Sequence, residues 1–70
     1  MNKTLYYVAL AINETYKVPI DKAINIINNS FLPEILKEMP DYVQHYDAEY
    51  WAEEIMKDFV NFIENFTESK

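Results

Sequence analysis

The residues most able to do chemistry gather in the middle of the chain, around its one histidine, His45. Asp47 and Glu49 follow at alternate positions, and Glu53 lies four residues after Glu49. Carboxylates at this spacing share a helix face, so they could bind a cation with His45 or act as an acid–base pair. One histidine among scattered acids is more typical of the solvated side of a helix. We therefore expect neither a metal site nor catalysis here.

Other reaction classes lack the residues that they need. The 70-residue chain contains no glycine, no cysteine and no arginine. Phosphate-binding loops of the dinucleotide and Walker types need glycines so that backbone amides can approach the phosphates, and thiol nucleophiles and guanidinium clamps are excluded as well. A serine triad would have to bring Ser30 or Ser69 to His45, but Ser30 follows asparagines that can end a helix and Ser69 is near the chain end. We expect no enzyme and no cofactor.

Negative charge is concentrated in the last thirty residues. Residues 1–40 carry four acids and four lysines, whereas residues 41–70 carry eight acids and two lysines and so hold the whole net charge of −6. Such a field disfavours nucleic acid and anionic membranes as direct ligands and favours a partner protein with a basic surface. The alternative explanation is that the charge only keeps the protein soluble.

Aromatic residues gather beside this charge, between residues 42 and 51, and aromatic side chains are typical anchors of protein interfaces. We expect Trp51 to lie mostly in the core, and Tyr46 and Tyr50 to be mostly exposed. The predicted partner-binding residues are Tyr42, His45, Tyr46, Asp47, Glu49, Tyr50, Glu53, Glu54 and Lys57.

Helices are predicted to position these side chains. Pro19, Pro33 and Pro40 fall between stretches of helical periodicity, and no segment alternates as a strand would. The expected helices cover about residues 4–16, 20–28, 31–39 and 47–66, with Asp47 as the N-cap of the last and longest one and a short turn through Tyr42 and Val43 before it. The predicted fold class is all-α, a small bundle of four helices forming one domain over residues 1–66, with a frayed tail at 67–70.

The first and last helices each have a recognisable apolar face. In the last helix that face comprises Ala48, Ala52, Ile55, Phe59, Phe62, Ile63 and Phe66. In the first helix the expected core face comprises Leu5, Val8, Ala9, Ile12 and Tyr16. Tyr7, Leu10 and Ala11 lie on the opposite side, and apolar residues there predict a self-association surface.

Several short segments resemble a family of short bacterial helical proteins of unknown function, sometimes encoded beside ADP-ribosyltransferase-like toxins. They are Ile12-Asn13-Glu14 ending at Tyr16, the set Ala23, Ile26 and Ile27, the segment 32–38, and Asp41 followed by Glu49-Tyr50 and Glu53-Glu54-Ile55. The family pattern has a glycine-containing turn after a histidine, where this chain has Gln44-His45-Tyr46-Asp47. The resemblance implies an accessory or antitoxin-like protein that binds another protein.

Three functional hypotheses follow. The first is a small acidic module, antitoxin-like or regulatory, that occludes a partner protein. The second is a phage-type inhibitor that mimics nucleic acid through an acidic helix face, and the third is a structural homo-oligomer, such as a homodimer through Tyr7, Leu10 and Ala11. Because the first twenty residues show no cleavable signal and no membrane-spanning stretch, we expect a cytoplasmic protein without a membrane partner.

Overall fold

Every regular element in the described part of the chain is an α-helix. A computed structural model describes the backbone of residues 1–68 and the side chains of residues 1–61 and 63. The helices are α1 (Lys3–Tyr16), α2 (Ile20–Asn28), α3 (Leu32–Glu38), α4 (Pro40–His45) and α5 (Ala48–Glu68). The all-α class is confirmed, and α5 is the longest helix, as predicted. It runs two residues beyond the predicted end at residue 66, and residues 69 and 70 lie outside the described residues.

The predicted count of four helices was wrong, because the expected turn through Tyr42 and Val43 is the helix α4. Pro40 ends α3, as expected. The fixed φ of proline also suits the first position of a helix, so Pro40 begins α4 at the same point. Met39, with φ −138° and ψ 67°, is the single residue between the two helices and redirects the chain.

Side-chain and backbone hydrogen bonds set the helix ends without any glycine. The Asn2 carbonyl oxygen, Oδ1, accepts from the backbone N–H of Thr4 at 2.7 Å and starts α1. Lys17 ends α1 in the left-handed conformation, with φ 60° and ψ 32°. The Ser30 hydroxyl joins α2 to α3, because it donates to the Ile27 carbonyl at 2.6 Å and accepts from the Leu32 N–H at 3.2 Å.

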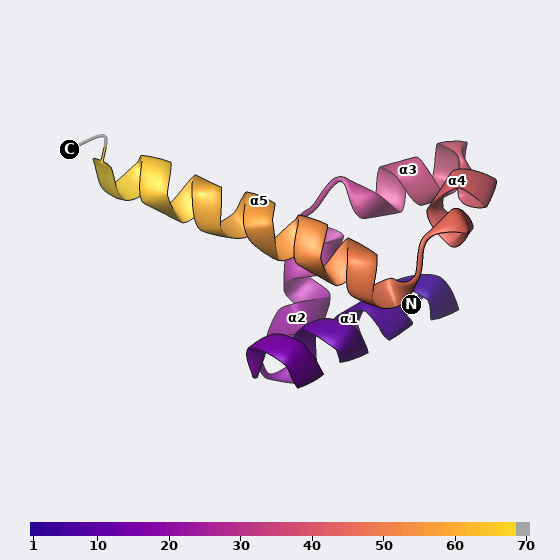
Figure 1. Cartoon of the computed structure of the whole chain (residues 1–70), viewed down its shortest axis with the longest axis horizontal. Helices are drawn as coiled ribbons and strands as arrows, with labels where there is room; N and C mark the ends of the chain where they lie inside the picture. The colour runs from indigo at the N-terminus through magenta and orange to yellow at the C-terminus, as the bar shows by residue number, and fades with distance from the viewer. Residues whose placement is uncertain (69–70) are drawn as a thin grey trace.

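The core forms around α1, which packs against both α2 and α5 (Figure 1). Two neighbouring helices widen the buried arc of α1, so Ala11 is buried together with the predicted core face. Tyr16, predicted to be core, is instead exposed at the end of the helix. No polar or charged side chain among the described residues is buried. The buried side chains are Leu5, Val8, Ala9, Ala11, Ile12, Ala23, Ile27, Leu32, Val43, Trp51, Ala52, Ile55 and Met56.

The C-terminal half of α5 projects beyond the other helices and gives the molecule its length of 40 Å, against 24 Å and 18 Å in the other directions (Figure 1). In the first half of the predicted apolar face, Ala52 and Ile55 lie in the core. Farther along the same face, Phe59 and Ile63 are 37% and 45% exposed. The side chains of Phe62 and Phe66 lie outside the described residues. None of the helices in the described residues combines the length and apolar character needed to cross a membrane.

Candidate functional site

Three tyrosines form an ordered row of rings where α4 meets α5. Tyr42 meets the edge of Tyr46 at a centroid distance of 5.7 Å, and Tyr46 stacks on Tyr50 at 4.2 Å with an angle of 18° between the rings. We call Tyr42, Tyr46 and Tyr50 the tyrosine row. Successive members lie four residues apart, so α4 and the first turn of α5 bring them together even though the chain leaves the helical conformation between them.

Buried Trp51 contacts every ring of the tyrosine row from the core side. Its ring makes edge contacts with Tyr42 at 6.0 Å, Tyr46 at 5.9 Å and Tyr50 at 5.0 Å. The indole Nε1–H donates to the Val43 carbonyl at 2.8 Å, and both residues are buried. Val43 lies in the last turn of α4, where carbonyls have no partner within the helix, so this bond satisfies one of them and ties α4 to α5. The prediction that Trp51 is a core residue is confirmed.

The tyrosines differ in how much of each ring reaches solvent. Tyr42 is 46% exposed and Tyr46 is 37% exposed, whereas Tyr50 is half-buried. The expectation of a mostly exposed Tyr50 was wrong, because the Tyr46 ring covers one of its faces and Trp51 meets it at an angle. His45 is exposed and meets the edge of Tyr46 at 5.0 Å, so it extends the aromatic surface by one ring.

The acidic residues of the predicted site have different roles. Asp47 accepts the Tyr50 backbone N–H at 2.9 Å, so the prediction that it caps the last helix is confirmed. Glu54 is paired with Lys57, whose Nζ lies 3.4 Å from the Glu54 carboxylate. Glu49 and Glu53 are exposed on the same helix. Unlike Asp47 and Glu54, these two predicted site residues neither cap a helix nor form an ion pair within the described part of the chain.

The Tyr50 hydroxyl resists ionisation. Displacement of water by neighbouring atoms raises its pKa above the usual value of 10.0, and the nearby Glu54 carboxylate raises it further. Tyr42 and Tyr46 act in the same direction, and Lys57 opposes them. Tyr50 therefore keeps its proton at neutral pH and can serve as a hydrogen-bond donor.

A shallow hollow beside the tyrosine row brings together residues that the sequence assigned to separate surfaces. Its volume is about 180 Å³, and Tyr7 of α1 and Tyr46 both line it. Tyr7 is exposed, whereas Leu10 is half-buried and Ala11 is buried, so the three residues predicted to mediate self-association do not form one exposed patch. Tyr7 instead borders the predicted partner-binding surface.

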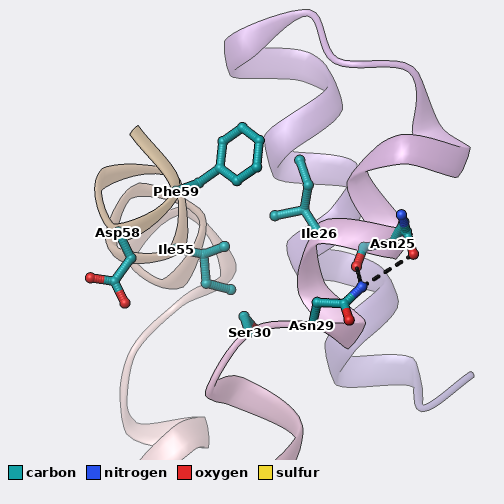
Figure 2. Close-up of a pocket in the computed structure, with 7 residues that line it drawn as sticks. All are labelled: Asn25, Ile26, Asn29, Ser30, Ile55, Asp58 and Phe59. Atoms are coloured by element: carbon teal, nitrogen blue, oxygen red, sulfur yellow. Dashed lines mark hydrogen bonds between the residues drawn. The ribbon is translucent and has the colours of Figure 1, made fainter. Parts of the chain in front are cut away.

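A second pocket lies between α2 and α5 and was not predicted. Its lining comprises Asn25, Ile26, Asn29, Ser30, Ile55, Asp58 and Phe59, and its volume is about 390 Å³ (Figure 2). The periodicity of α5 placed Ile55 and Phe59 on its apolar face, but no signal in the sequence indicated that the end of α2 lies beside them.

The described residues group no three His, Asp or Glu side chains closely enough to hold a metal ion. The Ser30 hydroxyl is bound to the Ile27 carbonyl, and Ser69 lies outside the described residues. The arrangement can therefore offer ring faces, ring edges, hydroxyls and carboxylates to a partner.

Comparisons of the chain with protein-family models, with curated proteins and with solved structures found no match. The resemblance to short bacterial helical proteins stays a prediction.

Proposed function

We propose that the chain is a protein-binding module whose contact surface is the tyrosine row together with Glu49 and Glu53. The module binds a partner protein with a basic surface and occludes it, as an antitoxin-like or regulatory protein does. It acts in the cytoplasm. The likeness to short proteins encoded beside toxins agrees with this role.

One observation carries the proposal: the exposed rings are already held in a fixed arrangement. Tyr46 lies between Tyr42 and Tyr50, and all three rings touch Trp51, which is itself held by the Val43 carbonyl. Side chains that are fixed before binding lose little conformational entropy in the complex, and tyrosines are among the residues that dominate interface affinity. If these rings served only to pack the core, they would be covered by other residues, but Tyr42 and Tyr46 are exposed.

The negative charge of Glu49 and Glu53 beside the tyrosine row favours a partner with a basic surface. Glu49 and Glu53 are exposed on α5, and residues 41–70 hold the whole net charge of −6. Lysine or arginine side chains of a partner can pair with these carboxylates, and arginine can also stack on an exposed tyrosine ring. Complementary charge accelerates association and excludes acidic competitors.

The proposal is tested by affinity purification from the source cell with three tagged chains. These are the unchanged chain, the double variant Tyr42→Ala/Tyr46→Ala, and the control Tyr16→Ala. Tyr16 is 40% exposed, against 46% and 37% for the two test residues, but it lies outside the row. A protein retained in equal amount by the unchanged chain and the control, and lost with the double variant, would support the proposal. Equal retention by all three chains would refute it.

Salt concentration separates this function from nucleic-acid mimicry. A mimic that holds its target only through carboxylates should release it as ionic strength rises, because screening weakens exposed charge pairs. A partner that is held through apolar ring contacts should stay bound as the ionic strength rises. A nucleic-acid-binding enzyme recovered only at low salt would favour the mimic, and recovery of the chain alone as a dimer would favour the homo-oligomer.

A further inference from the structure

The pocket between α2 and α5 has an apolar centre. Figure 2 shows Ile26 of α2 and Phe59 of α5 facing each other across the opening, with Ile55 beside Phe59 on the same helix. Ile55 is buried, Ile26 is half-buried and Phe59 is 37% exposed, so the apolar surface runs from the core to the outside. The volume of about 390 Å³ falls in the range of roughly 300–1,000 Å³ that is usual for ligand pockets.

The polar groups of the pocket stand at its edges and favour positive charge. On the α2 side, the Asn29 amide Nδ2 already donates to the Asn25 carbonyl at 2.8 Å, and the Ser30 hydroxyl donates to Ile27. Asp58, on the α5 side, is exposed. Among the described residues that line the pocket, Asp58 is the charged one. The charge at this edge is therefore negative, and the Asn29 and Ser30 donors on the α2 side are already engaged.

We infer that this pocket receives a basic, amphipathic segment of the partner protein, an inference that rests on the proposed function. An apolar side chain of that segment covers Ile26, Ile55 and Phe59, and a lysine or arginine extends to Asp58. Long basic side chains suit such a site, because their methylene stems lie on apolar surface while the charged head stays at the polar edge. Ile63, one helical turn beyond Phe59 and exposed, continues the apolar surface along α5, as in the docking of an amphipathic helix into a groove.

Charge distinguishes this occupant from a second copy of the chain. Each copy carries a net charge of −6, all of it contributed by residues 41–70, and docking on another copy through this pocket would bring two such acidic segments together. Juxtaposed like charges oppose association. A basic segment instead pairs with Asp58 and reduces the net charge of the complex.

The test uses NMR amide chemical-shift mapping with two synthetic amphipathic helical peptides, one built from leucine and lysine and the other with glutamate in place of lysine. The lysine peptide should shift the amides of Asn25, Asn29 and Asp58 with saturation, and the glutamate peptide should not. The variant Asp58→Lys should weaken binding of the lysine peptide about fivefold to tenfold. The control Glu38→Lys makes the same change in net charge on α3, outside the pocket, and should weaken binding about twofold at most.

Each other outcome would overturn the inference. Shifts confined to Tyr42, Tyr46 and Tyr50 would place the basic ligand on the tyrosine row and leave the proposed function standing. Equal losses in Asp58→Lys and Glu38→Lys would show attraction to net charge without a site, and the absence of saturable binding would remove the pocket as a docking site. A dimer of the chain alone that is disrupted by Phe59→Glu would make a second copy the occupant. The proposed function fails separately, if the Tyr42→Ala/Tyr46→Ala variant retains the partner.

Discussion

Replacing Trp51 by phenylalanine should destabilise the fold by removing one buried hydrogen bond. The indole N–H lies 2.8 Å from the Val43 carbonyl, both residues are buried, and phenylalanine has no donor. A buried carbonyl that loses its partner costs about 1–3 kcal/mol. The smaller ring also buries about 40 Å² less apolar surface, which adds about 1 kcal/mol. We therefore expect the free energy of unfolding to fall by about 2–4 kcal/mol.

Thermal and urea unfolding followed by far-UV circular dichroism would measure this loss. A chain of this length has a total stability of about 4–10 kcal/mol, so this loss should lower the Tm by at least about 8 °C. Tyr42→Phe is the matched control, because it keeps the ring that touches Trp51 and removes only an exposed hydroxyl. If Trp51→Phe were as stable as the control within about 0.5 kcal/mol, the bond to Val43 would not stabilise the junction of α4 and α5.

Three further predictions concern helix ends and titration. Asp47→Ala should lower the free energy of unfolding by about 0.5–2 kcal/mol in urea denaturation, because the Tyr50 N–H loses its acceptor, and an unchanged midpoint would contradict the assigned cap. Lys17→Gly should raise stability by about 1 kcal/mol in the same assay, since Lys17 has φ 60°, and a destabilised variant would refute this reasoning. NMR titration should place the Tyr50 pKa above 10.0, and Glu54→Gln should bring it nearer to 10.0; a pKa unchanged by Glu54→Gln would contradict the role of Glu54. Because the folded state holds this proton more tightly than the unfolded state, the contribution of Tyr50 to stability should be present below pH 10.0 and decline as the pH rises through the folded-state pKa.

Helix positions could be predicted from the sequence because the signals that begin and end them are local. Pro19 marks the start of α2, Pro40 marks the end of α3, and Asp47 supplies a side-chain acceptor to the first turn of α5. The same locality explains the missed helix. Pro40 predicts the end of one helix and also suits the start of another. The short helix that follows is packed by tertiary contacts such as the bond from Trp51 to the Val43 carbonyl, which the local sequence does not reveal.

The side-chain environments at the site could be predicted only in part, because they depend on more than one helix. A helical projection places Tyr50 on the polar face of α5, but the ring that covers it belongs to Tyr46, which precedes that helix. Ala11 is buried because α1 has two neighbours, whereas its own periodicity places it opposite the core. The pocket shared by Ile26 and Phe59 likewise arises from two segments far apart in the chain.

The most direct test of the central claim is the affinity of the purified partner for the unchanged chain, for Tyr42→Ala/Tyr46→Ala and for Tyr16→Ala, measured by isothermal titration calorimetry. If the tyrosine row is the binding surface, the double variant should lose at least about 2 kcal/mol, or roughly thirtyfold in Kd, while remaining folded. The Tyr16→Ala control should bind within about twofold of the unchanged chain. Equal Kd values for all three chains would show that the partner does not bind the tyrosine row.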